Sequence, residues 1–155
     1  PQNPDDHLHF NVSHSHDWAL LGFAKERPIG VDLEWLDRNS DVDLLATRVF
    51  NPKEYAEWEA LPESERTTAF FPLWTRTEAY PQAVGLGLTQ NPRTLHVSIG
   101  PDALLHADTT RPLEKQPDPS RAWSLHSHWV APRYLAALAV QGPLPEITHH
   151  EVRVW

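Results

Sequence analysis

The sequence of 155 residues contains no cysteine. Disulfide bonds, thiolate metal sites and cysteine nucleophiles are therefore excluded, and the redox compartment stays undecided. No run of 18 apolar residues is present and no signal peptide opens the sequence as given, so we expect a cytoplasmic protein without a membrane span. Lys and Arg number 13 against 21 Asp and Glu, a formal net charge of −8 at pH 7. Nucleic acids and anionic membranes are bound by clustered Lys and Arg, so we expect neither as a partner.

Large apolar side chains are plentiful by contrast. Hydrophobic residues make up 40% of the sequence, and seven Trp and five Phe supply much surface to bury. Fifteen Pro indicate many loops and short elements. This composition and length predict one domain with one core over residues 1–155.

Two carboxylates interrupt the apolar run at residues 28–34. Asp32 and Glu34 stand at positions i and i+2, so on an extended strand their side chains share a face, with Cα atoms about 6–7 Å apart. Both side chains are then within reach of one divalent ion.

A third carboxylate, Glu78, belongs to a different element. Residues 67–80 have the apolar spacing of a helix face packed on a core. Beside the strand pair, Glu78 completes a site made only of oxygen ligands, which favours Mg²⁺ over Zn²⁺, with Mn²⁺ as a substitute. Three crowded carboxylates without a cation would repel one another and have raised pKa values. The alternative is that each acid is an ordinary surface residue.

Four motifs in order carry a resemblance to a known family. They are FNVSHS (residues 10–15), GVDLE (30–34), FNPKEY (50–55) and FFPLWTRTEAY (70–80), which runs on to GLGL (85–88). In this order they resemble the 4′-phosphopantetheinyl transferases of the Sfp type, which activate carrier proteins of fatty-acid, polyketide and peptide synthases. The resemblance covers about the first 90 residues.

This resemblance implies an α+β fold in which an antiparallel sheet packs against helices, one half of a pseudo-twofold arrangement with coenzyme A in the cleft between the halves. The matched motifs belong to the end of the first half and all of the second. The resemblance therefore implies that the N-terminal half is absent from this sequence, which begins at Pro1.

The resemblance also implies roles for individual residues. Asp32, Glu34 and Glu78 would hold Mg²⁺, and Glu78 would double as the general base for the carrier-protein serine, directly or through a water. Ser13 and His14 would contact the 3′-phosphate end of coenzyme A. The acyl or peptidyl carrier protein would dock near the helices predicted over residues 41–61. Carrier proteins are commonly acidic, so the charge of −8 requires a basic half elsewhere to offset it.

The sequence departs from the family pattern at two coenzyme A positions. Family members usually carry lysines there that hold phosphates, and this sequence has Thr77 and Gln82. Each replacement removes a charge-assisted contact of about 1.5–3 kcal/mol. Arg76 is a partial substitute, although adjacent helical residues point about 100° apart. Proline at 81 is a further departure, and it predicts that the helix kinks or ends there, while Pro72 predicts that its regular part starts near that residue.

Two other functions stay open. The chain is either a catalytically impaired family member that binds coenzyme A, metal or carrier protein without turnover, or an isolated half that must pair with another chain to form a site. Ten histidines raise the question of zinc, with His126 and His128 at i and i+2 and His149 beside His150. Zinc sites need three or four convergent ligands, which the sequence does not establish, so solvated or hydrogen-bonded surface histidines are favoured.

Periodicity and turn signals predict the remaining elements. We expect a three-stranded meander from strands over residues 8–13 and 18–24 and the Asp32 strand. Helices are expected over residues 41–49, over 52–61 with Asn51 as N-cap and Glu54 at N3, and from residue 63 or 64 onward. Later strands are expected over residues 94–99, 122–130, 134–140 and 152–155, with a polar loop over 113–120.

Overall fold

The computed structural model describes residues 7–37, 40–85, 95–97, 102–107 and 123–153 of the chain. The helices in these residues are α1 (Val42–Val49), α2 (Pro52–Glu59) and α3 (Glu63–Ala83). The strands are β1 (Leu8–Ser15), β2 (Trp18–Lys25), β3 (Ile29–Trp35), β4 (Leu95–Val97), β5 (Asp102–Ala107), β6 (Trp123–Ala131) and β7 (Tyr134–Gln141). No helix in the described residues is long and apolar enough to span a bilayer.

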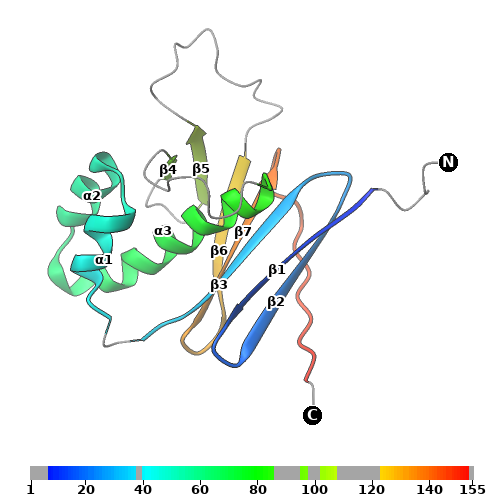
Figure 1. Cartoon of the computed structure of the whole chain (residues 1–155), viewed down its shortest axis with the longest axis horizontal. Helices are drawn as coiled ribbons and strands as arrows, with labels where there is room; N and C mark the ends of the chain where they lie inside the picture. Colours follow the sequence, from blue (N-terminus) through cyan, green and yellow to red (C-terminus); the bar gives the residue numbers. More distant parts are fainter. Residues whose placement is uncertain (1–6, 38–39, 86–94, 98–101, 108–122, 154–155) are drawn as a thin grey trace, which may run out of the picture.

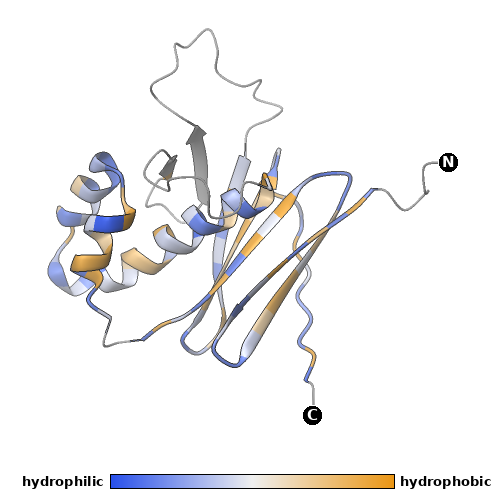
Figure 2. Cartoon of the chain, viewed as in Figure 1, coloured by the Kyte–Doolittle hydropathy of each residue, from blue (hydrophilic) through white to orange (hydrophobic). Residues whose placement is uncertain are grey.

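Five strands form one antiparallel sheet in the order β3-β7-β6-β5-β4. Helix α3 packs against β3 and β7, with α1 and α2 at its N-terminal end (Figure 1). The predicted α+β class, an antiparallel sheet packed against helices, is confirmed. Apolar positions of α3 and β7 form much of the core between these layers (Figure 2).

Strand β3 has two different faces because its side chains alternate. Ile29, Val31 and Leu33 pack into apolar clusters that include residues of β2 and β7. On the other face, a Cβ added at Gly30 would overlap the carbonyl oxygen of Ala79 in α3. The absent side chain at Gly30 therefore lets the helix approach the strand backbone closely.

The second helix begins at its predicted residue, and the first begins one residue later than predicted. The Asp41 carboxylate accepts from the Leu44 N–H at the start of α1. Asn51 and Glu54 form a reciprocal capping box with Pro52 at the first turn of α2. Helix α2 ends at Glu59, two residues before the predicted end.

Helix α3 continues through both of its prolines. It begins at Glu63 and ends at Ala83, so it neither starts near Pro72 nor ends at Pro81. Each proline removes one backbone hydrogen bond, which costs about 3 kcal/mol in an isolated helix. Pro81 is buried together with Ala79 on the helix face that packs on the sheet, and this burial offsets the loss.

The predicted meander of the first three strands is wrong. Strands β1 and β2 form a separate two-stranded hairpin, and β3 pairs with β7 instead. The hairpin lies beside β3 (Figure 1), with polar side chains of β1 directed at the backbone of β3. Because these side chains satisfy the N–H groups on that edge, no backbone ladder forms there.

The outer face of the hairpin is apolar and exposed. Its members are Leu8, Phe10, Val12, Leu21 and Phe23, named here the hairpin outer face. Phe10 lies directly opposite Phe23, and Val12 opposite Leu21, so the five side chains form a continuous surface. Nothing in the described residues covers it.

Predictions for the later part of the chain have mixed outcomes. Strands β6 and β7 match their predicted ranges within one or two residues, and β4 confirms part of the strand predicted over 94–99. Strand β5 was not predicted. Val152 and Arg153 are not in a strand, and residues 154–155 and the predicted loop over 113–120 lie outside the described residues.

Candidate functional site

The three predicted carboxylates come together between β3 and α3. Asp32 and Glu34 extend from the face of β3 that α3 covers, and Glu78 extends from α3. Burial is the main cause that raises the pKa values of Asp32 and Glu78; Glu34 and Glu78 add to the rise for Asp32, and Glu34 adds to the rise for Glu78. We call these three residues the carboxylate cluster.

Asp32 is the most buried member, at 6% exposed. Its Oδ1 accepts from the Ser13 hydroxyl at 3.2 Å, whereas its Oδ2 is buried without a hydrogen-bond partner. Burial is the main cause that raises the Asp32 pKa to about 7, and repulsion from Glu34 and Glu78 adds to it, while the Ser13 hydrogen bond acts in the opposite direction. An unpartnered buried carboxylate oxygen is unfavourable unless a ligand uses it.

Glu34 is held by an indole. Its Oε1 accepts from Nε1 of Trp74 at 3.0 Å, and this bond partly counters the rise in pKa that burial causes. Trp74 precedes Glu78 by four residues, so both side chains lie on one face of α3. Sequence reasoning placed Trp74 in the core and missed this role, although the spacing of four residues was the available signal.

The donor set fits a divalent cation in chemistry. All candidate ligands are carboxylate oxygens, one of them buried without a partner, and a cation would remove their mutual repulsion. Within the described ranges, no three His, Asp or Glu side chains are already arranged to hold a metal ion. One oxygen of Asp32 and one of Glu34 are engaged by Ser13 and Trp74, so the remaining oxygens are those available to an ion.

The two predicted phosphate contacts on β1 point in different directions. Ser13 is half-buried and faces β3, whereas His14 is exposed on the opposite face of the strand. Successive side chains of a strand alternate in this way. The structure therefore leaves His14 accessible to a ligand and engages Ser13 within the protein.

The two neutral positions that replace lysines also differ. Thr77 is 1% exposed, and its hydroxyl donates to the Leu73 carbonyl at 2.9 Å, so it presents no surface to a ligand. Gln82 is half-buried near the end of α3. Arg76 is 2% exposed and lies inside the protein rather than on the ligand-accessible surface.

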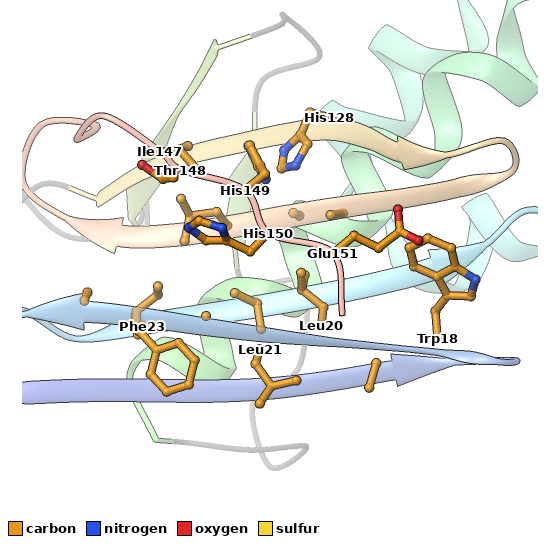
Figure 3. A pocket seen from close by; sticks show the side chains of 18 of the residues that line it. Trp18, Leu20, Leu21, Phe23, His128, Ile147, Thr148, His149, His150 and Glu151 are labelled. Carbon is orange, nitrogen blue, oxygen red and sulfur yellow. The ribbon is translucent and has the colours of Figure 1, made fainter. Parts of the chain in front are cut away.

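The histidines of β6 and the C-terminal segment form a second cluster away from the carboxylates. The rings of His126 and His128 stack at 5.5 Å between centroids, and His128 contacts His149 edge-on at 4.4 Å. Burial, then His149 and His126, lower the pKa of His128 to about 4. The rings of His128 and His149 border a hollow of about 1200 Å³ between β2, β3, β7 and residues 145–153 (Figure 3), which no member of the carboxylate cluster lines.

Comparisons with known proteins point to one family. Residues 28–139 match the sequence profile of the 4′-phosphopantetheinyl transferase superfamily. The 4′-phosphopantetheinyl transferase HetI of Nostoc sp. is 37% identical over 135 residues, which cover 87% of this chain and 52% of HetI. The 4′-phosphopantetheinyl transferase of Bacillus subtilis is 35% identical over 89 residues, which cover 57% of this chain and 38% of that protein.

A solved structure shares the fold. The holo-[acyl-carrier-protein] synthase of Thermotoga maritima superposes with a TM-score of 0.54 and 18% identity, covering 74% of this chain and 62% of that one. The chain spans about half of HetI and less of the other relative. With the family profile matching most of its length, the chain belongs to the 4′-phosphopantetheinyl transferase superfamily.

Proposed function

We propose that this chain carries the Mg²⁺ site of an Sfp-type enzyme that transfers 4′-phosphopantetheine from coenzyme A to a serine of an acyl or peptidyl carrier protein. Membership of the superfamily and the names of its relatives support the reaction type. The observation that carries the proposal is the Asp32 Oδ2, buried without a partner beside Glu34 and Glu78. A cytoplasmic location is part of the same proposal.

In this reaction the serine oxygen attacks the phosphorus that bears pantetheine, and the bond to adenosine 3′,5′-bisphosphate breaks. Asp32, Glu34 and Glu78 would hold Mg²⁺, with Mn²⁺ as a substitute; when bound, the ion neutralises charge on the pyrophosphate. Glu78 accepts the serine proton. Burial and Glu34 raise the Glu78 pKa, which brings this carboxylate closer to the range suited to a general base at neutral pH.

Coenzyme A contacts are the least supported part of the site. Of the four predicted residues, His14 is exposed and suited to a phosphate, and Gln82 is half-buried. The Ser13 and Thr77 hydroxyls are engaged by Asp32 and Leu73. We therefore propose His14 and Gln82 as the direct contacts.

A second candidate is an impaired family member that binds coenzyme A, metal or a carrier protein without turnover. The buried Thr77 and neutral Gln82, at the two expected lysine positions, favour it. Loss of two charge-assisted contacts weakens binding by roughly a hundredfold or more.

The proposal also includes contacts with an N-terminal half and with the carrier protein. The apolar hairpin outer face is suited to an N-terminal half, on the same or another chain, that covers it in the active protein. The carrier protein would dock near α1 and α2. Because the chain has a net charge of −8, a basic half would favour that encounter.

A transfer assay tests the function. The chain is incubated with coenzyme A, Mg²⁺ and a panel of apo carrier proteins, and mass spectrometry detects the phosphopantetheine adduct. Glu78→Gln should abolish transfer, and Glu65→Gln, an exposed residue of the same helix, should leave it unchanged. Coenzyme A binding without transfer would favour the impaired member. Neither binding nor transfer, even after an N-terminal half is supplied, would contradict both.

A further inference from the structure

Strand β1 presents three polar side chains to the edge of the main sheet. Asn11, Ser13 and Ser15 alternate along the strand with outward residues, and we call them the polar strap. Their side-chain oxygens accept the backbone N–H groups of β3 residues 31, 33 and 35 at 2.9, 3.1 and 3.0 Å. The strap thus satisfies three donors on the free edge of β3.

The three contacts have one geometry. Each joins residues 20 apart in sequence, so β1 and β3 advance together by two residues from one bond to the next. Ser13 and Ser15 therefore make equivalent backbone contacts with β3. They differ in one further bond.

Among the hydrogen bonds of the described residues, Ser13 has one to a carboxylate and Ser15 has none. Its hydroxyl donates to Asp32 Oδ1 at 3.2 Å while it accepts from the Leu33 N–H. A hydroxyl has a single hydrogen, so this donation leaves none for a phosphate. The Leu33 bond fixes the oxygen, and the hydrogen is directed at Oδ1.

The two oxygens of the Asp32 carboxylate therefore differ in their hydrogen bonding. Oδ1 has a donor from the strap, and Oδ2 is buried with no hydrogen-bond partner. A carboxylate held at one oxygen loses rotational freedom before any ligand arrives, which favours binding at the other.

We propose that Ser13 is a positioning residue for the carboxylate cluster, which fixes the Asp32 carboxylate through Oδ1 and leaves Oδ2 to serve the divalent cation. Ser13 acts on the ion through Asp32. This inference rests on the cation site proposed above.

The test compares Ser13→Ala with Ser15→Ala. Each variant removes one acceptor for a β3 N–H, so both should lower the melting temperature by similar amounts. Mn²⁺ affinity, measured from the electron paramagnetic resonance signal of the free ion, should fall about tenfold in Ser13→Ala. In Ser15→Ala it should stay within about twofold of the unmodified chain.

Two further variants distinguish loss of the Ser13 hydrogen bond from a folding defect. Ser13→Thr keeps the hydroxyl and should restore Mn²⁺ affinity, whereas Ser13→Cys keeps the size but donates weakly and should resemble Ser13→Ala. Equal Mn²⁺ affinity in Ser13→Ala, Ser13→Cys and Ser15→Ala would overturn the positioning role while leaving the cation site in place. Absence of Mn²⁺ binding to the unmodified chain, with and without coenzyme A, would overturn the cation site and the inference together.

Discussion

Two buried carboxylates of this chain, Glu54 and Asp32, have opposite hydrogen-bonding states. Glu54 is 0% exposed and Asp32 6%, and burial is the first cause that raises their pKa values to about 6 and about 7. Both oxygens of Glu54 accept backbone N–H groups, from Asn51 at 3.0 Å and Val97 at 2.6 Å. Asp32 has a donor at Oδ1 only.

The difference separates a structural acid from a functional one. Glu54 closes the capping box of α2 and ties that helix to β4, so its oxygens are used within the fold. Asp32 has two carboxylates as neighbours and an oxygen that the fold does not use. Burial and a raised pKa are common to both, so the unpartnered oxygen is the feature that identifies the site.

The largest expected effect is on metal affinity. Asp32→Asn removes the charge of the most buried ligand, and Mn²⁺ affinity should fall by about a hundredfold or more. Glu54→Gln removes an equal charge from a carboxylate outside the cluster and should leave Mn²⁺ affinity within about twofold. Isothermal titration calorimetry measures the Mn²⁺ affinity of both variants. An equal loss of affinity in the two would contradict the distinction between Asp32 as a ligand and Glu54 as a structural acid.

For the stability of the fold, we expect a substitution at Glu54 to cost more than a substitution at Asp32. Glu54→Ala leaves the N–H groups of Asn51 and Val97 without their acceptor, which should lower the free energy of unfolding by about 3 kcal/mol. Urea denaturation measures this value. Asp32→Asn, without added metal, should be neutral or stabilising because it removes repulsion from Glu34 and Glu78; a loss as large as that of Glu54→Ala would contradict the comparison.

Helix position gives a third test. Gly30→Ala would place a Cβ against the backbone of α3 at Ala79, which should cost about 1–3 kcal/mol and move Glu78 relative to Asp32. We expect Mn²⁺ affinity to fall about tenfold. Gly22→Ala, where the new Cβ meets Val31 and Ile29 side chains, should destabilise the chain without this effect. Unchanged affinity in Gly30→Ala would show that the close approach of α3 is not needed.

A fourth test is the pH dependence of stability that Asp32 causes. Its folded pKa of about 7 lies above its ordinary value of 3.8, so the folded chain binds more protons between these values. Without metal, the Asp32 contribution to stability should be present below about pH 4 and lost as pH rises to about 7. Urea denaturation across this range should show the trend, and Asp32→Asn or added Mg²⁺ should reduce it; the raised pKa of Glu54 contributes a trend of the same sign that Asp32→Asn leaves in place.

His128 changes the stability of the fold in the opposite direction over a similar pH range. Its folded pKa of about 4 lies below 6.5, so its contribution is present above about pH 6.5 and lost as pH falls toward 4. The Asp32 trend is therefore measured in a His128→Gln background. A pH dependence of stability that is unchanged by Asp32→Asn in this background would contradict the raised Asp32 pKa.

Local signals predicted much of the fold. Asn51 and Glu54 have the spacing of a capping box, and Asp32 and Glu34 have the spacing of a shared strand face, so both arrangements were readable from the sequence. Glu78 was placed beside them by family resemblance. Their proximity in the structure agrees with that placement.

Long-range packing accounts for what the sequence did not show. Pro81 was expected to interrupt α3, yet burial against the sheet keeps it helical. The contact of Ser13 with Asp32 depends on a hairpin that lies beside β3 without a backbone ladder, and no periodicity encodes that arrangement. Such contacts between distant segments are set by packing rather than by local propensity.

The most direct test of the account is an anomalous diffraction map from crystals grown with Mn²⁺ and coenzyme A. We expect a peak at the manganese edge between Asp32, Glu34 and Glu78, with Asp32 Oδ2 as a ligand and Oδ1 still bonded to Ser13. No peak at the cluster, or a peak only beside His128 and His149, would contradict it.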